Sequence, residues 1–172
     1  MEKNTDNEIR SAWKSLIVTQ NPSYWVTITF NRPVCDSEAI ASIKFFLKAL
    51  FKCLPRRFKS SLKFVVGAER TGRPKFAGSY HFHILVCGLD DRLVSPLEWL
   101  GNSVLKCASA IKNILGKPLC GPKNIDFGRI RDLDAVANYM VKYVRAGHDC
   151  AGKNLWFIDS NGSAGALSDY IS

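Results

Sequence analysis

The order of strand and helix patterns along the chain is the feature that most restricts its fold. Strands are predicted where β-branched and aromatic residues alternate with polar ones, and helices where apolar residues recur every three or four positions. Strand patterns cover residues 23–33, 61–69, 80–88 and 124–130, and helical patterns cover residues 35–55, 95–116 and 132–147. The order β-α-β-β-α-β-α predicts an α+β fold of the split βαβ, ferredoxin-like type. Its antiparallel sheet would carry two helices on one face and leave the other for a ligand and the third helix.

The length and the apolar segments set the domain organisation that we expect. A chain of 172 residues is long enough for one domain. We expect an N-terminal extension over residues 1–23, the domain over residues 24–147, and a tail over residues 148–172 in which no chemistry is recognised. The six cysteines form no CxxC pair, which favours reduced, buried thiols over a zinc finger. No apolar stretch approaches the length of a membrane span, so we expect a soluble cytoplasmic protein without a membrane partner.

Positive charge is concentrated between residues 44 and 75. The formal net charge is +9, and Glu69 is the single acidic residue in that stretch. Such a patch favours binding to a nucleic acid or an anionic membrane. A solvated helix face is the alternative for lysines spaced four residues apart. The candidate DNA-binding residues are Lys48, Lys52, Arg56, Arg57, Lys63, Arg70, Arg73 and Lys75.

Two histidines lie one residue apart in the strand pattern "YHFHILVCG". Because side chains alternate along a strand, Phe82 and Ile84 are expected to face the helices, and His81 and His83 the open face. The same alternation in the preceding strand places Glu69 on that face. Two imidazoles and a carboxylate predict an open site for one divalent ion, Mg²⁺ or Mn²⁺, with Glu69 as the third ligand. Structural or surface histidines are the alternative, and a closed structural metal site is disfavoured because a fourth ligand is missing.

The helical pattern near the C-terminus carries two tyrosines one turn apart, Tyr139 and Tyr143, with Lys142 between them. A helical wheel places these three side chains away from the aliphatic stripe, although a core role for the tyrosines is the alternative. A phenol becomes a useful nucleophile when a metal polarises a phosphate, and Lys142 would stabilise the phenolate or the charge on the phosphoryl group. The combination predicts transesterification of a nucleic-acid backbone, which leaves the enzyme attached to one DNA end.

Three segments together resemble the HUH endonuclease superfamily, and within it the rolling-circle replication initiators of single-stranded DNA phages and plasmids. These segments are "VTITFNRP", "HFH" and "YMVKY", and the resemblance covers residues 24–146. It implies a metal-dependent endonuclease that nicks and rejoins single-stranded DNA, or an origin hairpin, through a 5′-phosphotyrosine and leaves a free 3′-hydroxyl. The metal ligands would be His81, His83 and Glu69, and the first and second nucleophiles Tyr139 and Tyr143. Because no helicase motif follows, a separate helicase and host replication proteins would be partners.

Two other interpretations of the same residues stay open. A relaxase or a transposase uses the same chemistry on different DNA. A noncatalytic nucleic-acid-binding domain of the RNA-recognition type shares the βαββαβ order, but it would present exposed aromatic residues on the middle strands. Residues 70–75 form part of the predicted hairpin loop and would grip a DNA hairpin.

Overall fold

The computed structural model describes residues 2–53, 61–70, 78–89, 96–113, 115–142, 155–158 and 164–165. The helices are α1 (Glu2–Gln20), α2 (Asp36–Cys53), α4 (Pro96–Ser109) and α5 (Leu133–Val141), with a 3₁₀ turn η2 (Pro122–Asn124). The strands are β1 (Tyr24–Thr29), β2 (Lys63–Arg70), β3 (Tyr80–Cys87), β4 (Ile125–Arg129), β5 (Leu155–Ile158) and β6 (Ala164–Gly165).

The strands form one sheet in the order β4-β1-β3-β2-β5-β6, and every neighbouring pair is antiparallel. The first four strands in this list have the order of the split βαβ plan, so the α+β fold predicted from the sequence is confirmed. The strands β5 and β6 lie in the segment for which the sequence indicated no structure. They extend the sheet beyond β2 and cover an edge that would otherwise present unpaired backbone groups.

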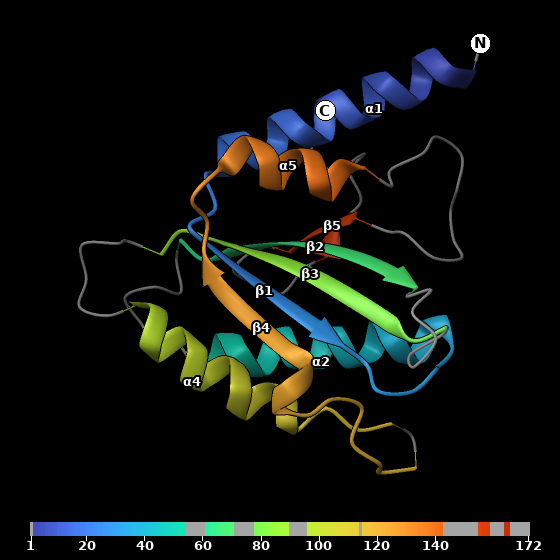
Figure 1. Ribbon diagram of the computed structural model, residues 1–172, viewed down its shortest axis with the longest axis vertical. Coiled ribbons are helices and arrows are strands. Elements are labelled where there is room, and N and C mark those ends of the chain that lie inside the picture. Colours follow the sequence, from blue (N-terminus) through green and yellow to red (C-terminus); the bar gives the residue numbers. More distant parts are fainter. Residues whose placement is uncertain are drawn as a thin grey trace.

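The helices form a layer on each side of the sheet (Figure 1). The pair α2 and α4 covers one face, as predicted, and α5 lies on the other face together with α1. Helix α1 was not predicted. Helix α5 ends at Val141 in the described part of the chain, and the rest of the predicted helix, residues 143–147, lies outside the described residues. None of the described helices is long and apolar enough to cross a membrane.

The second predicted helix is shorter than expected. It was predicted to continue to Gly116, but α4 ends at Ser109. The Asn113 side chain explains the difference, because its Oδ1 accepts hydrogen bonds from the backbone N–H groups of Leu115 and Lys117, at 3.0 and 2.8 Å. Such local bonds compete with helix formation. Gly116, at a φ of 72°, lies within the resulting turn.

Two hydrophobic cores lie on opposite faces of the sheet. The strand residues Phe82, Ile84 and Val86 belong to the larger core, which also contains side chains of α2 and α4. The intervening residue Leu85 belongs to a smaller core on the other face, which joins α1, the sheet and α5. The predicted alternation of β3 is therefore confirmed. Three described cysteines are buried and free as expected, whereas Cys35 and Cys53 are free but exposed.

Helix α1 holds α5 against the sheet. Trp13 and Ile17, one helical turn apart on α1, are buried in the smaller core together with Ala137 and Met140 of α5. The Lys14 Nζ atom also lies 2.7 Å from Asp134 Oδ1, at the start of α5. The N-terminal segment is thus part of the structure that supports α5.

Replacing Ile17 by Ala should destabilise the protein by about 2–5 kcal/mol, because the buried side chain leaves a cavity between α1 and the sheet. Its neighbour Val18 is 42% exposed, so Val18→Ala should change the free energy of unfolding by no more than about 0.5 kcal/mol. Urea unfolding of both variants measures the difference. Equal effects of the two substitutions would show that α1 does not pack as described.

Candidate metal centre and tyrosine

Strand pairing brings the two histidines and the carboxylate together. In the register of the sheet, His81 lies between Thr29 of β1 and Glu69 of β2. His83 lies between Thr27 and Gly67 on the same two strands. Glu69, His81 and His83 each offer one ligand atom, and these atoms lie within 4.8 Å of one another. The structure therefore brings together the three residues predicted to bind metal, each of them half-buried.

His81 is oriented by a hydroxyl that the sequence analysis did not single out. The Nδ1 atom of His81 lies 2.6 Å from Thr29 Oγ1. In the tautomer in which Nδ1 donates this hydrogen bond, Nε2 keeps its lone pair for a metal. Histidine ligands in metal sites are commonly held by such a bond from the second ring nitrogen. The alternation of "VTITF" places Thr29 on a defined face of β1, but its position opposite His81 depends on the strand register.

His83 lies closer to Glu69 and to α5. Its Nε2 atom is 3.7 Å from Glu69 Oε1, and its ring centroid is 4.5 Å from that of His81. Burial lowers the pKa of His83 to about 4. The imidazole is therefore neutral near pH 7, which is the form that binds a metal ion.

The donor set fits an open divalent metal site. Two imidazole nitrogens and one carboxylate oxygen are ligands that first-row divalent ions accept, and Mg²⁺ and Mn²⁺ favour the carboxylate and water oxygens that would complete the shell. No fourth His, Cys, Asp or Glu joins the group in the part of the chain that the structure describes. Three protein ligands leave coordination positions for water and a substrate oxygen, as in catalytic rather than structural sites.

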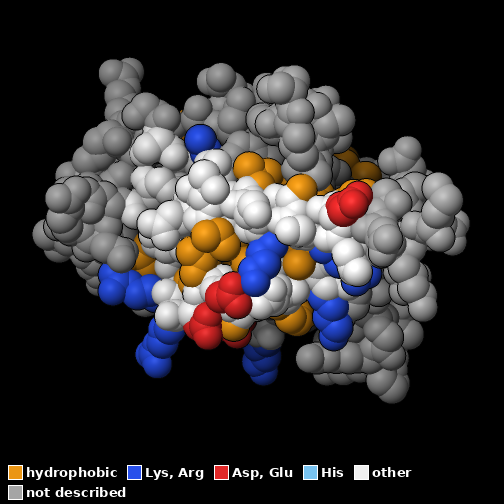
Figure 2. Space-filling view, turned by 90° about the horizontal axis from the view of Figure 1, so that it is seen from above, with side chains coloured by type: hydrophobic (Ala, Val, Ile, Leu, Met, Phe, Trp, Pro, Cys, Tyr) orange, Lys and Arg blue, Asp and Glu red, His pale blue; other side chains and the backbone are white. Residues whose placement is uncertain are grey.

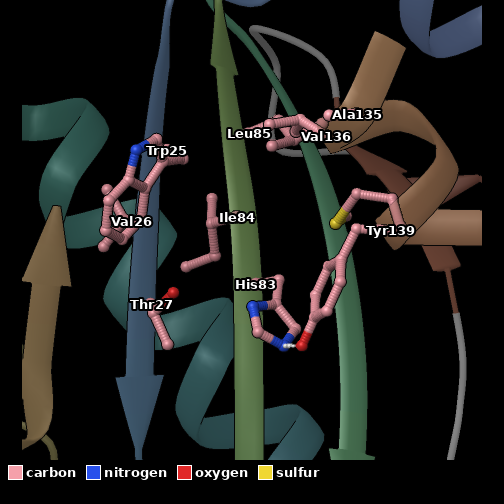
Figure 3. A pocket seen from close by; sticks show the side chains of 10 residues that line it. Trp25, Val26, Thr27, His83, Ile84, Leu85, Ala135, Val136 and Tyr139 are labelled. Atoms are coloured by element: carbon pink, nitrogen blue, oxygen red, sulfur yellow. Dashed lines mark hydrogen bonds between the residues drawn. The ribbon is translucent and has the colours of Figure 1, made fainter. Parts of the chain in front are cut away.

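Tyr139 on α5 reaches this group from above the sheet (Figure 3). Helix α5 begins after Asp132, whose carboxylate accepts a hydrogen bond of 2.9 Å from the Ala135 backbone. The Tyr139 hydroxyl lies 3.2 Å from His83 Nε2, and the two rings meet edge to face with centroids 4.9 Å apart. The Tyr139 side chain is 43% exposed. It therefore lies between the histidine and solvent.

The aliphatic stripe predicted for α5 packs as expected where the chain is described. Ala137, Met140 and Val141 are buried, and Leu133 and Val136 pack against them. Tyr139 is on a separate, exposed face, as the helical wheel indicated.

The other two residues of the tyrosine motif follow α5 in the sequence. Lys142 is exposed and comes immediately after the helix, where its backbone N–H donates to the Tyr139 carbonyl at 3.3 Å. Tyr143 lies outside the described residues.

The basic residues predicted to bind DNA do not gather at the histidines. Lys48 and Lys52 are exposed on α2, which covers the opposite face of the sheet. Lys63 donates a 3.0 Å hydrogen bond to Gln20. It lies six residues from Glu69 along β2, a separation of about 20 Å in an extended strand. Arg56, Arg57, Arg73 and Lys75 lie outside the described residues.

Arg70 contacts α2 rather than the histidine face. Its guanidinium pairs with Asp36 at the start of α2, donates to the Gly78 carbonyl at 2.9 Å and lies over the Tyr80 ring. Hydrogen bonds from Tyr80 and Arg70 lower the pKa of Asp36. These contacts fasten the base of the β2–β3 hairpin to α2. On the side of α1 and α5, basic side chains project from several points of the described surface (Figure 2).

Fold and site together define an α+β protein with an open His-His-Glu metal-binding group and an exposed tyrosine on one face of an antiparallel sheet. The family model of the replication-associated protein ORF2 matches residues 23–148. The chain therefore belongs to this family of replication-associated proteins. No curated protein and no solved structure is significantly similar to it.

Replacing Thr29 by Val should weaken Mn²⁺ binding about 10- to 100-fold, because His81 loses the hydroxyl that fixes its ring. Thr27→Val is the matched control, since Thr27 is on the same strand and face but opposite His83. Electron paramagnetic resonance of free Mn²⁺ measures both affinities. If the two variants bind Mn²⁺ equally well, Thr29 does not support a metal ligand.

The low pKa of His83 should make the metal-free protein less stable in acid. The unfolded chain takes up a proton near pH 6.5, whereas the folded His83 does so only near pH 4. The stability is therefore complete above pH 6.5 and falls as the pH decreases from 6.5 to 4. Between pH 7 and pH 5, His83→Asn should remove on the order of 1–2 kcal/mol of the pH-dependent loss. Urea unfolding in EDTA measures it, and an unchanged pH dependence in the variant would contradict this account.

Proposed function

We propose that this chain is an HUH-type initiator of rolling-circle replication, which nicks and rejoins single-stranded DNA at an origin through a 5′-phosphotyrosine intermediate. The observation that carries the proposal is the 3.2 Å contact between the Tyr139 hydroxyl and His83 of the metal-binding group. A nucleophile and an electrophilic metal must meet at one phosphate, and this contact sets the required proximity. Membership of a replication-associated family supports DNA as the substrate.

The proposed site uses Glu69, His81 and His83 to hold Mg²⁺ or Mn²⁺. When bound, the ion would polarise the scissile phosphate and neutralise developing negative charge. Tyr139 Oη then forms a bond to phosphorus as the bond from phosphorus to the 3′ oxygen breaks. The phenol loses its proton and the departing 3′ oxygen gains one, so the products are a 5′-phosphotyrosine and a free 3′-hydroxyl. Attack of a 3′-hydroxyl on the phosphotyrosine reverses these steps and rejoins the strand.

Lys142 and Tyr143 complete the proposed machinery. Lys142 is exposed directly after α5, where its ammonium group would stabilise the tyrosine oxygen or the phosphoryl charge. Tyr143 would be the second nucleophile and would allow another cut while Tyr139 still holds the first DNA end. Unwinding would come from a separate helicase, together with host replication proteins. Relaxation or transposition of DNA by the same chemistry is the alternative biological role.

A covalent adduct with defined polarity tests the proposed reaction. The substrate is single-stranded DNA of the replicon that encodes the chain, with different labels on its two ends, in Mn²⁺. The 3′-end label should stay with the protein after denaturation, and the 5′-end label should appear in a shorter strand that a polymerase can extend. EDTA and His81→Ala should each abolish the adduct, because both remove the metal site.

Tyr139→Phe should lower adduct formation at least 100-fold, whereas Tyr24→Phe, in the larger core, is the matched tyrosine control and should retain it. Tight DNA binding without any adduct would instead establish a noncatalytic nucleic-acid-binding domain. An adduct that forms equally well in EDTA would exclude the metal-dependent mechanism.

A further inference from the structure

A cavity of about 300 Å³ lies between α5 and the β1–β3 part of the sheet (Figure 3). Its lining includes His83 and Tyr139, so it adjoins the candidate active site directly. Ala135 and Tyr139 on its rim are exposed, which shows that the cavity opens to solvent. It is therefore an accessible pocket and not a closed packing defect.

The walls of the cavity are suited to a flat, uncharged group. The sheet contributes Trp25, Thr27 and Leu85, and α5 contributes Val136 and Met140. No Lys, Arg, Asp or Glu is among the described residues that line it. A phosphate would find no counter-charge there, whereas a ring could stack on the indole and hydrogen-bond to the threonine hydroxyl.

Strand β4 gives the Trp25 indole its place. Trp25 pairs with Gly128 across β1 and β4, and a Cβ atom at Gly128 would lie 3.1 Å from the Cζ2 and Nε1 atoms of the indole. Only the missing side chain leaves room for the ring at this position. Thr27 follows on the same face, opposite His83, so the indole and the hydroxyl lie in line with the active site (Figure 3).

We propose that this cavity takes one unpaired nucleobase of the DNA strand, next to the phosphate held at Glu69, His81 and His83, with Trp25 as the stacking surface. The inference rests on the proposed function, because a strand with its phosphate at the metal group has a neighbouring base beside His83 and Tyr139. It adds a base-binding site to a reaction that otherwise contacts only the backbone. Inserting one base would fix which phosphate reaches Tyr139.

Abasic scanning tests the base-binding site without requiring nicking. An oligonucleotide is selected from a random single-stranded pool for binding to the full chain in EDTA, and single abasic sites are then introduced along it. Fluorescence anisotropy should show one position at which losing the base weakens binding about tenfold. Trp25→Ala should bind the intact oligonucleotide about tenfold more weakly and should lose the sensitivity at that position, whereas Trp25→Phe should keep most of both.

A second variant fills the cavity without removing an existing contact. Ala135→Leu, at an exposed position on the rim, should weaken binding of the intact oligonucleotide but leave binding of the critical abasic oligonucleotide unchanged. This result holds even if Trp25→Ala proves to be unfolded by circular dichroism. A flat abasic profile, or the same profile in wild type and in both Trp25→Ala and Ala135→Leu, would overturn the base-binding site.

The nicking assay separates the two proposals. A covalent adduct combined with a flat abasic profile would overturn the base-binding site alone. Position-specific coupling between Trp25 and one base, without any adduct, would support the pocket and contradict the proposed nicking activity. A pool that yields no binder would overturn the base-binding site, whatever the adduct assay shows.

Discussion

The packing of α5 onto the sheet is the interaction on which the site depends. Its buried residues Ala137 and Met140 contact a core that also contains Leu85 of β3 and Ile17 of α1. Burying one aliphatic side chain contributes about 1.5–3 kcal/mol, whereas the neutral hydrogen bond between Tyr139 and His83 contributes about 1 kcal/mol. The apolar contacts therefore set where the phenol lies, and the hydrogen bond selects its orientation.

The pairing of three strands supplies the other half of the site. Thr29, His81 and Glu69 lie side by side on β1, β3 and β2 because the register places them in one row across the sheet. Shifting β2 by one residue relative to β3 would turn Glu69 to the opposite face, where it would meet the core of α2 and α4. The larger core thus protects the metal-binding geometry indirectly, since it fixes which strand residues face inward.

Much of this arrangement could be predicted because periodicity survives in a single sequence. Alternation along two strands was enough to place His81, His83 and Glu69 on one face, and the α5 wheel separated Tyr139 from the aliphatic stripe. Helix α1 was missed although Trp13 and Ile17 are one turn apart, because a mostly polar segment does not reveal a partner that lies more than a hundred residues away. Contacts across strands, such as Thr29 with His81 and Trp25 with Gly128, depend on a register that local patterns do not specify.

The central claim is that Tyr139 reacts with DNA at the His-His-Glu group, and mass spectrometry of the adduct tests it most directly. The wild-type chain would be trapped in a single turnover with Mn²⁺ and single-stranded replicon DNA, then digested with nuclease and protease. We expect a nucleotide bound through a 5′-phosphate to the peptide that contains Tyr139, with the modification on that phenol. A nucleotide found only on another tyrosine would contradict the account, because the side chain in contact with His83 would then not be the one that attacks.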